Sequence, residues 1–212
     1  MTKAHFITLE GGEGTGKSTQ IKLLAEALEA TGVQVTTTRE PGGSPGAEQI
    51  RKLLVEGDVA RWDGVTESLL HFAARRDHLV KTVWPAIEEG KWVISDRFAD
   101  STQAYQGVGH GIDQDVISAL YQAAVGNFEP DLTLILDLPV ELGLMRAGSR
   151  GDSEDRYERM GHAFHKSLRQ AFLNIAETNP NRCVVIDATG SIEEIHQAIK
   201  QTVAKRLDID LL

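Results

Sequence analysis

The sequence contains little cysteine, no long apolar run and no obvious targeting segment. Its single cysteine, Cys183, excludes an internal disulfide, and its apolar neighbours indicate that it packs as a small hydrophobic residue. No apolar run approaches the roughly 20 residues that a membrane-spanning helix needs. The N-terminus lacks the charged and apolar regions of a signal peptide. These absences favour a cytoplasmic protein that has no membrane partner.

Positive charge is also scarce. The 212 residues include 31 Asp and Glu but only 22 Lys and Arg, which gives a formal net charge of −9. A chain this acidic is poorly suited to bind nucleic acid, because Lys and Arg have to neutralise the phosphates. Any bound phosphate must therefore be held locally, and several arginines do lie close to the motifs described below.

Five short apolar runs alternate with helical patterns along the chain. This order is typical of a parallel sheet with helices on both faces, so we predict a three-layer α/β fold with a five-stranded parallel sheet. No internal repeat, low-complexity tract or linker interrupts the pattern, and we therefore expect a single domain over residues 1–212. The expected strands are 6–9, 33–38, 92–95, 132–138 and 184–187.

A glycine-rich loop with Walker A spacing follows the first expected strand. It reads Gly, four residues, then Gly-Lys-Ser, and a helical pattern begins directly after it. Backbone amides of such a loop turn toward phosphate oxygens, and the next helix adds partial positive charge at its N-terminus. The lysine is expected to hold the β- and γ-phosphates of a nucleotide and the serine to ligate Mg²⁺. The predicted nucleotide-binding residues are Gly11, Gly12, Glu13, Gly14, Thr15, Gly16, Lys17 and Ser18.

Two further motifs lie at the ends of later strands. Asp96 and Arg97 follow the third strand, where the carboxylate suits a metal-bound water and the guanidinium suits a phosphate. A buried Asp–Arg pair is the structural alternative. Arg39 opens a tight loop after the second strand, and Arg51 lies on the next helix. Ligands of parallel sheets bind beyond the carboxyl ends of the strands, so we expect these side chains to meet the P-loop.

In series, these motifs resemble the thymidylate kinase family, most closely its bacterial members. The resemblance covers nearly the whole chain. It implies a P-loop NTPase fold with a short lid at about 146–157, phosphorylation of dTMP to dTDP with ATP and Mg²⁺ as a step of dTTP synthesis, and a homodimer. The most specific segments are Arg39-Glu40-Pro41-Gly42-Gly43, Asp96-Arg97-Phe98 and Ala104-Tyr105-Gln106-Gly107.

The resemblance also implies roles for particular residues. Lys17 and Arg97 act on the phosphates, while Asp96 assists Mg²⁺ through water or accepts a hydrogen bond from Lys17. Glu13 binds the 3′-hydroxyl of the dTMP sugar, and Tyr105 crowds the ribose 2′ position. The metal site is assigned to Ser18 and Asp96. The implied dTMP-binding residues are Glu13, Arg39, Arg51, Phe72, Arg75, Arg97, Thr102, Tyr105 and Gln106.

The P-loop contains no arginine, so the resemblance implies that the lid supplies the catalytic one. Arg150 is the first choice for the γ-phosphate of ATP and Arg156 the second, and Arg146 is expected to stack on adenine. A closing lid excludes water from the reacting groups. The alternative for each of these arginines is a solvated charge on a polar loop.

The residue that stacks on the base is ambiguous. The family places a ring four residues before the arginine that bonds the thymine carbonyl, and for Arg75 that position is His71. Phe72 comes next, and Phe72 to Arg76 has the same spacing. We favour stacking by Phe72 with Arg75 bonding the carbonyl. Stacking by His71 is the alternative, and burial of Phe72 in the core is the structural one.

Other classes of P-loop protein fit the chain less well. A GTPase would carry an Asn-Lys-x-Asp motif, which this sequence lacks. A deoxynucleoside kinase needs a general base near the 5′-hydroxyl, for which Asp96 and Glu40 are the candidates. A nucleotide-dependent binding module needs no acceptor pocket. The arginines assigned to an acceptor phosphate argue against the nucleoside kinase.

Overall fold

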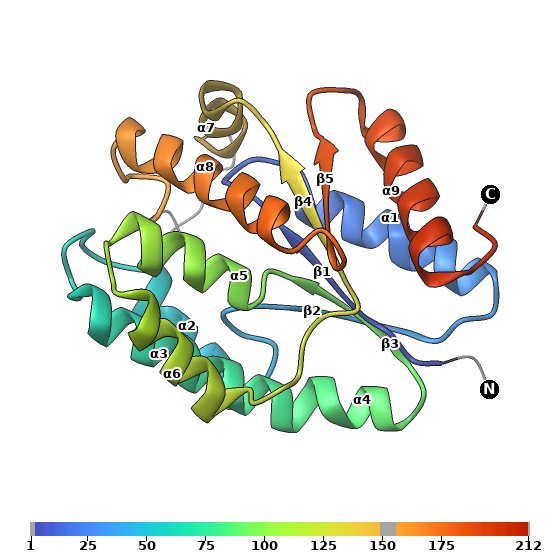
Figure 1. Cartoon of the computed structure of the whole chain (residues 1–212), viewed down its shortest axis with the longest axis horizontal. Helices are drawn as coiled ribbons and strands as arrows, with labels where there is room; N and C mark the ends of the chain where they lie inside the picture. Colours follow the sequence, from blue (N-terminus) through green and yellow to red (C-terminus); the bar gives the residue numbers. More distant parts are fainter. Residues whose placement is uncertain (1–2, 149–155, 212) are drawn as a thin grey trace.

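The structure is a computed structural model that describes residues 3–148 and 156–211, and its centre is a parallel sheet (Figure 1). Over these residues the sheet has five strands in the order β2-β3-β1-β4-β5, and every neighbouring pair is parallel. The predicted sheet is confirmed, with strand ends that move by one or two residues at most. The strands are β1 (Phe6–Glu10), β2 (Val35–Arg39), β3 (Trp92–Asp96), β4 (Leu132–Asp137) and β5 (Cys183–Asp187).

Helices cover both faces of this sheet, as Figure 1 shows. On one face α1 (Lys17–Ala30) and α9 (Ile192–Leu207) share a core with Ile7 and Leu9 of β1. Phe6 of β1 points to the opposite face. The helices of that face include α3 (Gly64–His78), the π-helical segment η1 (Leu79–Val83), α4 (Trp84–Glu88), α6 (Gln114–Ala124) and α8 (His162–Thr178).

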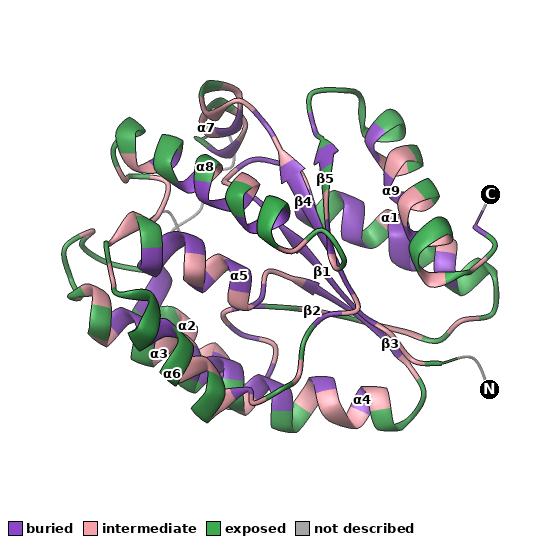
Figure 2. Cartoon of the chain, in the orientation of Figure 1, coloured by how far each residue is buried: buried purple, intermediate pink, exposed green. Residues whose placement is uncertain are grey.

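The burial pattern explains why the central strand reads as a continuous apolar run. All five residues of β1 are buried, whereas the edge strand β2 is partly exposed (Figure 2). A parallel strand covered on both faces has no solvent side, so it shows no alternation of polar and apolar residues. None of the described helices is long and apolar enough to cross a membrane.

Several helices were not predicted from periodicity. Two of them form one continuous stretch after β3, and the third follows β4. A short or glycine-containing helix shows few repeats of the 3.6-residue pattern, so this signal is weak. These helices are α5 (Ala99–Thr102), the π-helical segment η2 (Gln103–Gly109) and α7 (Val140–Gly148). Between β2 and α3 the chain forms α2 (Pro45–Val55).

Strand register brings the three sequence motifs to one edge of the sheet. Leu9 of β1 and Arg39 of β2 both lie opposite Asp96 of β3. The loops that follow these strands therefore start side by side, as expected for parallel strands whose carboxyl ends share an edge. The predicted lid falls mainly on residues 149–155, which lie outside the described residues.

Candidate active site

The P-loop wraps around the ammonium group of Lys17. Lys17 Nζ donates to the carbonyl oxygens of Gly11 and Gly12, at 3.2 and 2.9 Å, and to Thr15 Oγ1 at 3.3 Å. Burial, assisted by the charge of Arg97, lowers the pKa of Lys17 to about 8. A phosphate placed here would favour the charged form, because it adds an opposite charge at short range.

The path of this loop depends on glycine at position 14. Gly14 has φ of +67°, and a Cβ on it would collide with the carbonyl oxygen of Gly143. Gly16 precedes α1 in the left-handed conformation and offers no side-chain oxygen to the first turn of the helix. The amides at this N-terminus therefore remain suited to an anion.

A hydroxyl and a carboxylate meet beside the P-loop. Ser18 Oγ donates to Asp96 Oδ2 at 3.0 Å, which joins the first turn of α1 to the end of β3. Oxygen ligands of these two kinds are those that Mg²⁺ prefers in proteins, so the pair fits the predicted metal site.

Arg97 lies next to this pair in an unusual backbone conformation. Its φ is +69°, a region that residues other than glycine rarely adopt. Its Nη1 donates to the Gly11 carbonyl at 2.9 Å and to Ser101 Oγ at 3.2 Å, and its Nη2 donates to Glu13 Oε1 at 3.0 Å. The guanidinium thus lies between the P-loop and α5, and Arg97 lines the crevice beside them.

Glu13 connects Arg97 with Tyr105. The same Oε1 that accepts from Arg97 also accepts from the Tyr105 hydroxyl at 2.5 Å. Burial by itself would raise the pKa of Glu13, but Arg97 and Lys17 outweigh it and lower this pKa to about 2. The carboxylate is therefore ionised at neutral pH and accepts hydrogen bonds only.

Sequence reasoning missed Glu10, whose carboxylate is hydrogen-bonded to the segment that follows Arg97. Its Oε1 accepts from the Phe98 amide at 2.7 Å and its Oε2 from Ser101 Oγ at 2.6 Å. Burial, with a contribution from Asp100, raises the pKa of Glu10 to about 8. One signal pointed to it, since it is an ionisable residue at the end of an apolar strand directly before the P-loop.

Arg39 and Arg51 line the opposite wall of the crevice. Arg39 Nη2 lies 3.1 Å from Glu48 Oε2, and the Arg39 side chain is half exposed. Arg51 Nη1 donates to the Pro41 carbonyl at 2.6 Å. Both guanidinium groups thus border the same solvent-accessible space as Arg97.

Glu40 is occupied by structural contacts rather than available as a base. Its two carboxylate oxygens lie 2.8 Å from Arg75 Nε and 2.9 Å from His78 Nδ1. Burial would raise the pKa of Glu40, but Arg75 and His78 outweigh that effect and lower it. A buried, doubly paired carboxylate is a poor candidate for the general base that a deoxynucleoside kinase would need.

Arg75 is held so that one nitrogen remains for a ligand. Its Nη2 donates to the Phe98 carbonyl and to Thr102 Oγ1, both at 3.1 Å, while Glu40 takes Nε. Among the described residues Nη1 has no hydrogen-bond partner although it is buried. Thr102 is buried behind Arg75 and does not line the cavity, so its expected contact with the base is replaced by a contact with Arg75.

The ring at the base end of the cavity is His71, and this placement contradicts our preference for Phe72. Phe72 is 3% exposed and packs in the core beneath α3, whereas His71 lines the cavity. His71 Nε2 lies 3.0 Å from the Tyr157 hydroxyl. Burial, only partly offset by Glu67, lowers the pKa of His71 to about 4, so the imidazole is neutral at physiological pH.

Arg156 does not reach the ATP side of the crevice, contrary to its sequence assignment. It is fully buried and donates to the carbonyls of Leu54, Asp58 and Val59, at 2.9, 3.0 and 3.0 Å, and it pairs with Glu67. The guanidinium of Arg156 therefore binds the end of α2 and the connection between α2 and α3, and not a nucleotide. The first choice for the lid arginine, Arg150, lies outside the described residues.

Arg146 lies on α7, away from this pocket. Its Nη1 donates to the Ala188 carbonyl at 3.4 Å, in the loop that follows β5. Gly11 and Gly12 contact Lys17 through their carbonyl oxygens and do not line this pocket.

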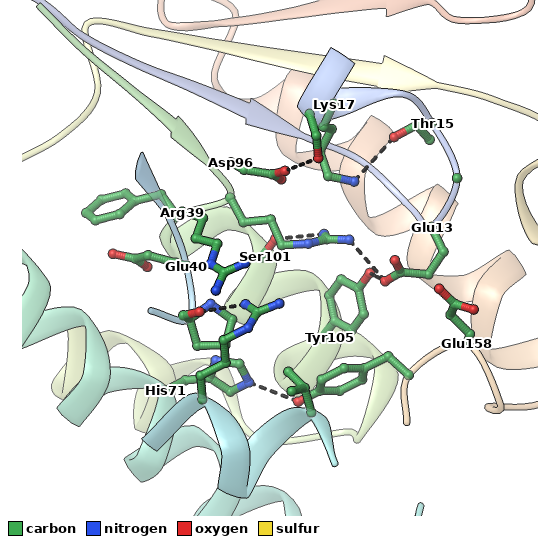
Figure 3. A pocket seen from close by; sticks show the side chains of 18 of the residues that line it. Glu13, Thr15, Lys17, Arg39, Glu40, His71, Asp96, Ser101, Tyr105 and Glu158 are labelled. Atoms are coloured by element: carbon green, nitrogen blue, oxygen red, sulfur yellow. Dashed lines mark hydrogen bonds and ion pairs between the residues drawn. The ribbon is translucent and has the colours of Figure 1, made fainter. Parts of the chain in front are cut away.

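One cavity of about 290 Å³ unites most of the predicted site. Lys17 and Asp96 lie at one end, His71 lies at the other, and Glu13 and Tyr105 lie between (Figure 3). Phosphate-binding groups at one end and a ring at the other, with Arg75 Nη1 and Gln106 Oε1 lacking a partner among the described residues, match a bound nucleotide. The predicted residues that line it are Glu13, Gly14, Thr15, Gly16, Lys17, Ser18, Arg39, Arg51, Arg75, Asp96, Arg97, Tyr105 and Gln106.

A P-loop that shares one cavity with Arg39, Arg51 and Arg97 is typical of a P-loop kinase acting on a small phosphorylated acceptor. Residues 9–199 match the family model described as thymidylate kinase. The chain belongs to the thymidylate kinase family.

Curated relatives and a solved structure agree with this assignment. The chain is 53% identical over 209 residues to a thymidylate kinase of Caulobacter vibrioides, covering 99% of this chain and 100% of the relative. It is 51% identical over 207 residues to one of Bradyrhizobium sp. strain ORS 278, covering 97% and 92%. The crystal structure of thymidylate kinase from Ehrlichia chaffeensis superposes with a TM-score of 0.76 at 36% identity, covering 94% of this chain and 98% of that one.

Proposed function

We propose that this protein phosphorylates dTMP to dTDP with ATP, the reaction of its family and a step of dTTP synthesis. The observation that supports this most is that one cavity is lined both by the P-loop and by His71, Arg75 and Gln106. Two nucleotides that enter from opposite ends bring their phosphates together between Lys17 and Arg97. Holding both reactants in line supplies much of the rate in such a transfer.

On the donor side, the P-loop amides and Lys17 hold the phosphates of ATP. Ser18 and Asp96 hold Mg²⁺, either directly or through water, because their oxygens already meet beside the P-loop. When it is bound, Mg²⁺ neutralises charge on the phosphoryl oxygens. Arg146 stacks on adenine, and Arg150 remains our choice for the γ-phosphate. An Arg150→Ala protein with near-normal turnover would remove that last assignment.

On the acceptor side, Arg97 binds the 5′-phosphate of dTMP together with Arg39 and Arg51. Glu13 accepts a hydrogen bond from the 3′-hydroxyl of the sugar, and Tyr105 fills the space that a 2′-hydroxyl would need. Both assignments are supported by the contact between Glu13 and Tyr105, which places them at the middle of the cavity.

The chemistry needs no strong general base. A phosphate monoester is already ionised at neutral pH, so the acceptor oxygen attacks the γ-phosphorus of ATP without losing a proton, while the bond from that phosphorus to the β,γ-bridging oxygen breaks and ADP leaves. The protein orients the two polyanions and neutralises their charge through Lys17, Arg97 and Arg150. A reaction without a general base agrees with the contacts of Glu40, whose two carboxylate oxygens are already paired with Arg75 and His78.

At the base end, we revise the sequence assignment and propose that His71 stacks on thymine. Arg75 Nη1 donates a hydrogen bond to the carbonyl oxygen at C4 of the base. Gln106 Oε1 accepts a hydrogen bond from the N3–H group of the base. These roles are supported by two atoms, Arg75 Nη1 and Gln106 Oε1, which are buried on the cavity and have no partner among the described residues.

We also propose a homodimer and a cytoplasmic location. Exposed apolar side chains on α3 and the segment after it support a protein interface there, namely Val65, Leu69 and Val80, at 43%, 51% and 44% exposure. Light scattering of the wild type and of Leu69→Glu tests the dimer, which this substitution should weaken. The cytoplasmic location rests on the single cysteine.

The function is tested by mixing the protein with ATP, Mg²⁺ and one of three acceptors: dTMP, thymidine or none. ADP release is followed in each case. We expect rapid release with dTMP only. Equal turnover with thymidine would indicate a nucleoside kinase, and ADP release without an acceptor would indicate an ATPase or switch protein.

A further inference from the structure

Glu67 is a fully buried carboxylate of α3 that lies behind the base pocket and does not line the cavity. It contacts groups from two other segments of the chain. Its Oε1 accepts from Gln106 Nε2 at 2.7 Å and from the Tyr157 hydroxyl at 3.0 Å. Its Oε2 pairs with Arg156 Nη2 at 2.5 Å.

The contact with Gln106 has a direction. An ionised carboxylate only accepts hydrogen bonds, so the amide of Gln106 must turn its NH₂ toward Glu67. Burial would raise the pKa of Glu67, but His110, His71 and Arg156 outweigh it and lower this pKa to about 2. The amide oxygen of Gln106 is consequently left facing the other way, where it is buried and unpartnered within the described part of the chain.

Gln106, which carries that oxygen, lines the same cavity as Arg75, which carries a donor without a partner among the described residues. Both residues are at least 98% buried. The pocket therefore presents an acceptor from Gln106 and a donor from Arg75 Nη1. This pair matches a pyrimidine with N3–H and a carbonyl at C4. It does not match a pyrimidine with an unprotonated N3 and an amino group at C4, because donor then faces donor and acceptor faces acceptor.

We propose that Glu67 is a specificity-determining positioning residue, which selects pyrimidines of the thymine type over those of the cytosine type by locking the Gln106 amide in one orientation. The proposal rests on the proposed function. Glu67 touches no substrate, and it acts through Gln106. The competing view is that Glu67 serves only as the partner of Arg156 and stabilises the fold.

Competition between dTMP and 5-methyl-dCMP tests the proposal directly. These acceptors share the methyl group, sugar and phosphate, and they differ only at N3 and C4. Both are mixed with ATP, Mg²⁺ and enzyme, and the two diphosphates are separated and quantified. The ratio of the two kcat/KM values does not depend on how much enzyme is folded, nor on any defect that slows both acceptors equally.

For the wild type we expect preference for dTMP by a factor of at least about 10³, because a site built to hydrogen-bond its substrate rejects the mismatched analogue strongly. In Glu67→Gln the amide at position 67 can donate or accept, so Gln106 is free to flip. We expect the ratio to fall about 10- to 100-fold, the effect of relieving one buried mismatch. Arg75 still donates to a carbonyl and not to an amino group at C4, so dTMP should remain the preferred acceptor and the ratio should stay above one.

Two further variants separate positioning from simple stabilisation. Tyr157→Phe removes another donor from the same Glu67 oxygen but leaves the Gln106 amide held, so the ratio should stay at the wild-type value. The double variant Glu67→Gln, Gln106→Glu places an acceptor-only group on the cavity again, and it should restore most of the ratio. Thermal unfolding of each protein reports stability separately.

The outcomes are distinct. A folded Glu67→Gln protein with the wild-type ratio, or a Tyr157→Phe protein whose ratio falls as far, would overturn the role of Glu67. If Glu67→Gln does not fold, Glu67→Asp keeps the charge but withdraws it from Gln106, and its ratio should fall as well; an unchanged ratio there would overturn the proposal. A wild type that does not phosphorylate dTMP would instead refute the proposed function.

Discussion

Replacement of Glu40 by glutamine tests whether one buried ion pair holds in place Arg75, the arginine that we propose binds the base. Glu40 is 5% exposed, and Arg75, 2% exposed, lies 2.8 Å away through Nε. Glu40→Gln keeps the shape of the side chain and one oxygen for Arg75, but it removes the negative charge. The guanidinium then remains buried without a counter-charge, and His78 loses its contact with an ionised partner.

The expected loss of stability follows from the burial of this pair. Removing one partner of a buried pair costs about 3–5 kcal/mol, and we expect the lower value, about 3 kcal/mol, because glutamine still accepts one hydrogen bond. In a domain of this size each kcal/mol lowers Tm by about 2–4 °C, so Tm should fall by about 6–12 °C. The KM for dTMP should rise more than the KM for ATP, since Arg75 lies at the base end.

Calorimetry and steady-state kinetics measure these two effects. Glu26→Gln is the matched control, because Glu26 pairs with Lys22 on the surface of α1 at 4.0 Å and both side chains are more than half exposed. An exposed pair of this kind contributes about 0–1 kcal/mol, so this control should unfold close to the wild type. A Glu40→Gln protein whose Tm lies within about 2 °C of the control would refute the reasoning.

Three further predictions concern single residues. Glu13 has a pKa of about 2, below its ordinary 4.5, so its ionised form stabilises the fold above pH 4.5 and this contribution is lost as the pH falls toward 2. The unfolding free energies of wild type and Glu13→Gln should therefore differ by about 3 kcal/mol at pH 7 and converge only as the pH falls to about 2, and parallel curves would contradict this. His71→Ala should raise the KM for dTMP with little change in Tm, whereas Phe72→Ala should cost about 3–5 kcal/mol of stability in urea unfolding, and the reverse pattern would return the stacking role to Phe72. Arg97→Ala should lower kcat about 10³-fold or more while the Kd for ATP measured by calorimetry stays within a few-fold, and unchanged kcat would remove Arg97 from the transfer step.

The contiguous parts of the site could be predicted from the sequence because their geometry is local. The P-loop is defined by glycines and a lysine within eight residues, and its place between a strand and a helix follows from the flanking patterns. Arg39 and Asp96 could be assigned to the same crevice for a topological reason. Parallel strands deliver their carboxyl ends to one edge, and the register puts these two residues opposite each other.

The ring that faces the cavity could not be chosen in this way. His71 and Phe72 are neighbours on α3, so their side chains point about 100° apart around the helix axis. Either residue satisfies a four-residue spacing to an arginine, and the packing of α3 on the sheet decides which one is buried. That packing places Phe72 in the core with Phe6 and Val93 and leaves His71 to the cavity.

Arg156 was misassigned for a similar reason. Its neighbours in sequence belong to the polar segment expected to close over ATP, but its partners lie on residues 54–59 and on Glu67, roughly 90 to 100 positions away along the chain. A guanidinium buried against three carbonyls and a carboxylate has no local sequence signature. The supporting carboxylates Glu10 and Glu67 were overlooked because each acts through a residue that is distant in sequence.

The order of apolar runs, the P-loop and the motifs at the strand ends were enough to establish a three-layer α/β fold and its family, because each depends on residues that are close in sequence or on a general rule of parallel sheets. The tertiary structure alone decided which ring faces the cavity, which arginine is buried and which carboxylates contact the residues that line it. These choices depend on contacts between distant segments, where burial and charge pairing of a side chain are set by neighbours that a linear pattern does not reveal.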